Sequence, residues 1–153
     1  MSFVLALDFA SVTGWAIGHL GAGVHFSGTW DIRPRRGESP GMRYIHLRRK
    51  LEEIIAAYPD IILVVYEQAH NRGGAPTEYG HGCVAILQEW CAQRNLNFHP
   101  IHSSTLKKFA TGKGNANKEA MMGAATARGW RFADDNECDA LWLLEYALKE
   151  VVA

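Results

Sequence analysis

The chain has few cysteines and no long apolar run. Only three cysteines occur in 153 residues, an odd number without the spacing of a metal-binding motif. No apolar stretch approaches the roughly 20 residues of a membrane-spanning helix, and the N-terminus lacks the basic segment and small-residue cleavage site of a secretory signal. These absences predict a cytoplasmic protein with reduced thiols and no membrane association. The length predicts a single domain over residues 1–153.

The chain also lacks a net charge, but its charges are unevenly distributed. Residues 33–50 hold seven basic side chains and one acid, and residues 102–118 hold four lysines and no acid. Residues 134–150 hold six acids and one lysine. Basic flanks around an acidic centre suit a metal-dependent nuclease, because the flanks hold phosphates and the centre holds metal ions. A solvated charged surface is the alternative interpretation.

Apolar periodicity predicts an alternation of strands and helices. Strands are expected at residues 3–8, 13–20, 23–30, 61–67 and 97–101. Helices are expected at residues 42–58, 82–94, 118–129 and 135–151. The segment 71–80 is expected to be a loop, and the glycine- and lysine-rich segment 111–118 a loop or a short broken helix. Residues 102–105 resemble a helix N-cap cluster. The order β-β-β-α-β-α-β-α-α predicts an α/β fold with a mixed five-stranded sheet, three antiparallel strands followed by parallel strands, and helices on both faces.

Three acidic residues lie where these elements end or begin. Asp8 and Glu67 end the apolar strands 3–8 and 61–67, and Asp139 lies near the start of the last helix. A carboxylate beside a buried strand is costly unless a metal ion or a cation compensates its charge. Three acids from distant segments that converge on one point would form a divalent-metal site, which points to phosphodiester chemistry. Alternatively, Glu67 ends its strand in solvent and Asp134 or Asp135 caps the last helix.

Taken in order, these segments resemble the RuvC-like Holliday junction resolvases of the RNase H-like (retroviral integrase) superfamily, particularly the compact forms carried by phages. The matching residues are Asp8 with the Ser-Val-Thr-Gly turn that follows it, the Glu67 strand, and the closing Asp-Asn-Glu-Cys-Asp-Ala-Leu. The segment 102–118 matches in character, and the order of elements agrees along nearly the whole chain. The resemblance implies an RNase H-like fold and an endonuclease that cuts four-way junctions by two-metal-ion hydrolysis.

The resemblance also implies the ligands of two Mg²⁺ or Mn²⁺ ions: Asp8, Glu67, Asn136 and Asp139. Asn136 departs from the family pattern, which has an acid or sometimes a histidine at this position. An amide keeps the shape but loses the charge, so the second ion is expected to bind weakly. Three explanations stay open: Asp135 supplies the charge, the protein tolerates the amide, or an Asp→Asn change was introduced to inactivate it. The alternative functions are therefore a junction-binding protein without activity and a related RNase H-like nuclease for other branched or hybrid substrates.

Branched DNA is the expected partner, and several residues are expected to bind it. These are Arg72, Gly73, Gly74, Ser103, Ser104, Lys107, Lys113 and Lys118. Glycines permit close approach of the DNA backbone, and lysine supplies a point charge for phosphates. The arginines Arg33, Arg35, Arg36 and Arg43 either follow a duplex arm or form a solvated surface. A symmetric homodimer through the 82–94 helix is expected, because a four-way junction requires two identical strands to be cut at symmetric positions.

Overall fold

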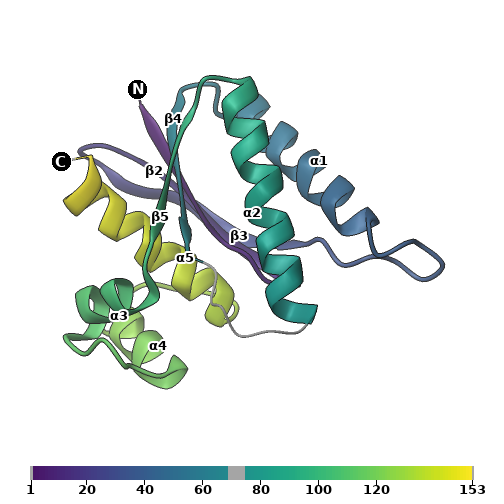
Figure 1. The fold of residues 1–153 in the computed structure, drawn as a ribbon. Helices are drawn as coiled ribbons and strands as arrows, with labels where there is room; N and C mark the ends of the chain where they lie inside the picture. Colours follow the sequence, from purple (N-terminus) through teal and green to yellow (C-terminus); the bar gives the residue numbers. More distant parts are fainter. Residues whose placement is uncertain (1, 69–74, 153) are drawn as a thin grey trace.

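A five-stranded mixed sheet forms the centre of the fold (Figure 1). The computed structural model of the chain describes residues 2–68 and 75–152. The strands are β1 (Phe3–Asp8), β2 (Val12–His19), β3 (Gly23–Asp31), β4 (Ile61–Glu67) and β5 (Asn97–Ile101). They lie in the order β3-β2-β1-β4-β5, with β1, β2 and β3 antiparallel, β4 parallel to β1, and β5 parallel to β4. The predicted α/β fold with a mixed sheet is confirmed.

Helices cover both faces of this sheet, as predicted (Figure 1). The helices are α1 (Met42–Ala57), α2 (Ala75–Gln93), α3 (Ser103–Thr111), α4 (Lys118–Ala127) and α5 (Asp135–Tyr146), which continues as a π-helical turn at Ala147–Val151. The helices α1 and α2 pack on one face, and α3, α4 and α5 pack on the other. No helix in the described parts of the chain is long and apolar enough to cross a membrane.

Strand side chains alternate between two separate hydrophobic cores. In β1, Val4 and Ala6 lie in the core under α3, α4 and α5, whereas Leu5 and Leu7 lie in the core under α1 and α2. This is the period of two that a pleated strand imposes. Because both faces are covered, β1 and β4 are apolar at every position before their final acids, which accounts for the unbroken apolar runs in the sequence.

Two helical segments differ from the prediction. The helix α2 begins at Ala75, seven residues before the predicted start, so the expected loop at 71–80 is wrong for residues 75–80. Pro76 is the second residue of α2, and proline is tolerated in a first turn because the N–H it lacks has no partner there. The predicted order also omitted α3, although the N-cap cluster expected at 102–105 is confirmed at its start. Gly112, with a φ of 85°, is the C-cap of this helix. The side chain of His102 caps α3 by accepting a hydrogen bond from the Ser104 N–H at 3.2 Å.

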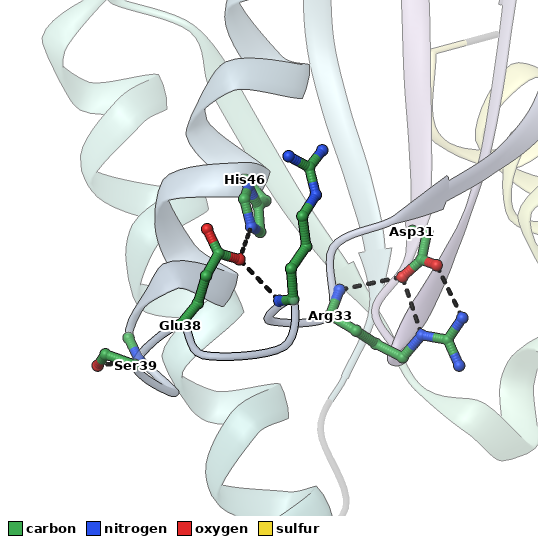
Figure 2. A network of polar contacts seen from close by, with 7 residues as sticks. Asp31, Arg33, Glu38, Ser39 and His46 are labelled. Carbon is green, nitrogen blue, oxygen red and sulfur yellow. Dashed lines mark hydrogen bonds and ion pairs between the residues drawn. The ribbon is translucent and has the colours of Figure 1, made fainter.

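Hydrogen bonds to two acidic residues stabilise the connection between β3 and α1 (Figure 2). Asp31 accepts hydrogen bonds from the side chain of Arg33 at 2.9 and 2.7 Å. Glu38 accepts one from the Arg35 N–H at 2.7 Å and lies 3.0 Å from Nε2 of His46. Both acids therefore form hydrogen bonds with residues close to them in the sequence.

The three cysteines and Trp90 of α2 lie in the hydrophobic cores. Cys83, Cys91 and Cys138 are buried and form no disulfide. Trp90 on α2 is 1% exposed, and its Nε1 donates a hydrogen bond to Glu52 at 2.9 Å. The tryptophan of α2 therefore contributes to the core and not to an outer surface.

Candidate metal and nucleic-acid site

Three acidic side chains meet at one end of the sheet. Asp8, Glu67 and Asp139 each offer a carboxylate oxygen, and these oxygens lie within 4.8 Å of one another. Each of the three residues is half-buried. The structure thus brings together residues that are 59 and 72 positions apart in the sequence.

Strand pairing and side-chain alternation explain the meeting of Asp8 and Glu67. Each acid is the last residue of its strand, and β1 and β4 are parallel neighbours, so their carboxyl ends lie side by side. Asp8 follows Ala6 by two positions, and Glu67 follows Val65 by two, where Ala6 and Val65 both lie in the core under α5. Because side chains two apart in a strand share a face, both carboxylates point toward α5.

A glycine lets α5 approach these two strands. Gly14 of β2 pairs with Asp8 in the antiparallel ladder. A Cβ atom added at position 14 would lie 1.9 Å from the main-chain oxygen of Asn136, in the first turn of α5. No side chain fits at that distance, so glycine is required for the backbone of α5 to rest on β2. The contact places the first turns of α5 beside the end of β1.

The first turn of α5 holds the remaining acids that the sequence singled out. Asp134 is the N-cap, and its carboxylate accepts a hydrogen bond from the Glu137 N–H at 2.9 Å, so the capping interpretation holds for this residue. Asp135 forms an ion pair with Lys118 at 3.1 Å. Asn136 and Asp139 are three residues apart and share a face of α5.

Burial and like charge raise the pKa values of the clustered acids. The pKa of Asp8 is raised well above its usual range by burial and by the carboxylates of Asp139, Glu67 and Asp135. Burial and the same neighbours Glu67 and Asp135 raise the pKa of Asp139 to about 7, although Lys107 and Lys118 oppose the shift. The cluster is therefore short of positive charge. Carboxylate oxygens are the ligands that Mg²⁺ and Mn²⁺ prefer, so this donor set fits such ions.

A pocket of about 320 Å³ adjoins the acids. It is lined by Glu67, Ser103, Leu106, Lys107, Ala116, Asn117, Lys118, Met121 and Asp139. Three residues that the sequence predicted to bind DNA, Ser103, Lys107 and Lys118, therefore lie beside the acidic cluster. Their positions follow from α3 and α4, which form the walls of the pocket across from the strand ends.

The other predicted DNA-binding residues lie elsewhere. Ser104 is exposed, and its hydroxyl lies 2.8 Å from Nδ1 of His102, at the cap of α3 and outside the pocket lining. Lys113 is exposed in the connection between α3 and α4, also outside the lining. Arg72, Gly73 and Gly74 lie outside the described residues.

Sequence reasoning missed one residue that shapes the site, Asn117, and left the role of Thr13, in the turn after Asp8, undefined. Asn117 lines the pocket and caps α4, because its Oδ1 accepts a hydrogen bond from the Ala120 N–H at 2.8 Å. Thr13 is fully buried, and its hydroxyl donates to the Ala10 carbonyl at 3.0 Å, which fixes the turn after Asp8. An asparagine directly before a helix was a readable N-cap signal, whereas nothing in the sequence alone identifies the contact of Thr13.

Comparison with known proteins shows the fold. No protein-family model matches the chain, and no curated protein matches it by sequence. RuvC from T. thermophilus, solved in complex with a Holliday junction substrate, superposes with a TM-score of 0.76 at 14% identity, covering 94% of this chain and 91% of that chain. A further structure of Thermus thermophilus RuvC gives a TM-score of 0.71 at 15% identity, covering 93% and 90%.

A third similar structure is the yeast mitochondrial Holliday junction resolvase Ydc2. It gives a TM-score of 0.65 at 11% identity, covering 96% of this chain and 77% of that chain. The resemblance to RuvC-like resolvases is therefore confirmed at the level of the fold, and the chain has the RNase H-like architecture of RuvC along nearly its whole length.

Proposed function

We propose that this chain is a structure-selective endonuclease that cuts four-way DNA junctions. The observation that carries the proposal is the convergence of Asp8, Glu67 and Asp139 at the end of a RuvC-like sheet. The adjoining pocket presents Lys107 and Lys118, whose charges suit phosphate groups. A similar structure bound to a Holliday junction supports the choice of substrate.

The carboxylates would hold two Mg²⁺ or Mn²⁺ ions. Asp8, Glu67 and Asp139 would each supply a charged oxygen, and Asn136 or Asp135 would complete the set. When bound, such ions supply activation of a water molecule and stabilisation of the departing 3′ oxygen. The chain itself holds the oxygen ligands in fixed positions, at the ends of β1 and β4 and on α5.

Pocket residues would hold the DNA backbone at these acids. Lys107 is half-buried and near enough to lower the pKa of Asp139, so its ammonium group would approach the scissile phosphate closely. Lys118 would exchange its ion pair with Asp135 for a phosphate, which would free Asp135 to act as a ligand. Ser103 would donate its hydroxyl hydrogen to a phosphate oxygen.

The first test is substrate choice. The protein would be incubated with a synthetic four-way junction, a duplex and an RNA–DNA hybrid, with Mg²⁺ or Mn²⁺. We expect selective binding and cutting of the junction, and we expect Asp139→Asn to bind it without cutting. Equal affinity for the junction and the duplex would reject the proposal, and preferential cutting of the hybrid would indicate the related nuclease function instead.

The second test concerns the amide at position 136. We infer that Asp135 replaces the missing charge, because it raises the pKa of both Asp8 and Asp139 and is therefore close to them. Asp135→Asn should then lower the cleavage rate at least tenfold, whereas Asp135→Asn combined with Asn136→Asp should recover it. Unchanged cleavage by Asp135→Asn would contradict this assignment.

A junction-binding protein without cleavage is the second candidate function, and Asn136 is the observation that favours it. In that case the chain binds the junction and does not cut it with either ion, and Asn136→Asp creates cleavage. Cutting by the chain as it stands would eliminate this candidate.

A further inference from the structure

A second pocket, of about 270 Å³, lies next to the turn that follows Asp8. Its walls are the turn Phe9–Ser11, Arg43 near the start of α1, and Tyr79 and Gly80 on α2. It therefore faces the helices α1 and α2, whereas the pocket at the acids faces α3 and α4. Both pockets lie at the same end of the sheet, because Phe9 directly follows the last residue of β1.

Arg43 is the buried cation of this pocket. The residue is only 7% exposed, so it is not part of a solvated basic surface. Its Nε is fully buried and has no hydrogen-bond partner. The guanidinium lies over the ring of Tyr79, 4.3 Å from the ring centre. Such a contact attracts the charge but leaves the N–H donors of the guanidinium without acceptors.

The acids of the segment that leads into α1 do not pair with Arg43. Asp31 is held by Arg33, and Glu38 is held by the Arg35 N–H and His46 (Figure 2). Within residues 2–68 and 75–152, no carboxylate forms an ion pair with Arg43. A buried guanidinium is normally paired, because burial of an isolated charge is costly. An open pocket beside an unpaired buried cation therefore has the properties of an anion site.

We propose that this pocket binds a backbone phosphate of the DNA strand that is cut, adjacent to the scissile phosphate, with Arg43 as its ligand. The inference rests on the proposed nuclease function. One strand of DNA carries a phosphate about every 3.4 Å along the helix axis, and successive Cα atoms are about 3.8 Å apart. A strand with one phosphate at Asp8 therefore has a neighbouring phosphate within reach of the turn Phe9–Ser11. The planar fork of arginine suits the two oxygens that a phosphate presents.

The turn between the two pockets supports a fixed spacing of the two phosphates. Thr13 is buried, and its hydroxyl donates to the Ala10 carbonyl at 3.0 Å, which holds the turn against β2. Asp8 and Arg43 are thus positioned by neighbouring parts of one rigid scaffold. By binding one phosphate, Arg43 would fix the position of the DNA strand along the protein surface. The neighbouring phosphate would then lie at the acids and be the one that is cut.

The test is a neutral-linkage scan of the junction. A single methylphosphonate would replace each phosphate in turn, up to three positions on either side of the scissile one. Equilibrium binding would be measured in an Asp139→Asn background, so that no cleavage occurs. One flanking position should weaken binding on the order of tenfold, the value expected for losing one charge-assisted contact. In Arg43→Met that position should lose its effect, and the salt dependence of binding should flatten by about one phosphate equivalent.

Arg49→Met is the matched control, because Arg49 is exposed on the same helix and does not line the pocket. It should retain the full effect of the methylphosphonate. An Arg43→Met protein that binds the junction with the same position dependence as its parent would overturn this inference while leaving the nuclease proposal intact. A parent protein that does not prefer the junction over a duplex would overturn both.

A second variant keeps the test decisive if Arg43→Met fails to fold. Ser11 is exposed on the rim of the pocket, so Ser11→Glu should fold normally and place a carboxylate beside the guanidinium. The position-specific methylphosphonate effect should then disappear, and junction affinity should fall on the order of tenfold. The exposed Thr126 on α4 provides the control Thr126→Glu, which should change neither. Persistence of the effect in Ser11→Glu would overturn the inference.

Discussion

The acidic residues of the site oppose one another when no cation is present. Asp8 and Asp139 both have raised pKa values because they are partly buried among like charges. Carboxylates that are placed well for a cation repel one another in its absence. The arrangement that favours cation binding therefore lowers the stability of the metal-free protein. This repulsion should make the stability of the metal-free protein depend on pH.

We predict that the metal-free protein loses stability as the pH rises from about 4 to about 7. Burial, together with Glu67 and Asp135, raises the pKa of Asp139 from its usual 3.8 to about 7, so the folded chain binds this proton more tightly than the unfolded chain. Stability from this group is therefore present at low pH and is lost as the carboxylate ionises. The thermal midpoint should fall by several degrees between pH 5 and pH 8.

Two comparisons isolate this effect. Asp139→Asn should flatten the decline between pH 5 and pH 8, and Mg²⁺ at pH 8 should raise the midpoint of the parent but not that of the variant. Asp31, whose pKa is lowered to about 2 by Arg33, titrates below this range and does not interfere. A midpoint of the parent protein that does not change over this range would contradict the prediction.

At the scale of the elements, the contact between α5 and β2 determines whether the site assembles. Gly14→Ala would place a Cβ atom 1.9 Å from the main-chain oxygen of Asn136, so α5 must move. We expect a loss of about 1–3 kcal/mol in the free energy of unfolding, as for overpacked cores. Cleavage should fall more than stability explains, because Asp139 moves with the helix. Denaturant unfolding and single-turnover cleavage would measure the two effects.

The control for this substitution is Gly123→Ala in α4, where an added Cβ atom meets nothing within 4 Å. It should leave cleavage unchanged and stabilise the protein by up to about 1 kcal/mol, since alanine favours the helix. Normal activity in Gly14→Ala would show that the backbone contact does not position Asp139.

The elements differ in how well the sequence predicts them. The strands 3–8 and 61–67 are predicted with the observed bounds, because each is an apolar run that ends at an acid. The bounds of 97–101 also agree, although this strand contains His99 and Pro100. The start of α2 is not predicted because glycine and proline in this segment are typical of loops, although proline is acceptable in a first turn. The N-cap cluster at 102–105 predicts the start of α3, but the rest of this helix is missed because it is short and precedes a glycine-rich connection.

The residues of the site also differ in how well the sequence predicts them. The acids Asp8, Glu67 and Asp139 could be selected because a charge at the end of an apolar run conflicts with burial and demands an explanation. Arg43 gave no such signal, since it lies among seven basic residues that read equally well as a surface. Its burial depends on the packing of α1, α2 and the β1–β2 turn together, and such packing has no local sequence pattern.

At the scale of the whole molecule, we propose that two copies pair through the outer side of α2. Ala85 and Ala92 are exposed and lie two turns apart on this helix, so they present small side chains on one side. A two-fold dimer would place two sites symmetrically on a four-way junction.

We predict that Ala85→Arg combined with Ala92→Arg yields a folded monomer. Light scattering with size-exclusion chromatography would measure the mass, and a cruciform plasmid would report whether cuts are paired. The dimer should produce linear DNA and the monomer nicked DNA. Ala127→Arg, at the exposed end of α4, should behave as the parent. A dimeric double variant would place the interface elsewhere.

The alternation that directs Asp8 and Glu67 to one face also determines which sequence changes leave the fold intact. One residue inserted within β1 or β4 would exchange the two core faces of that strand, so the fold would fail together with the site. A carboxylate changed to an amide leaves the strands and both cores as they are. A change from carboxylate to amide therefore removes a charge without removing the fold, whereas an insertion within β1 or β4 removes both.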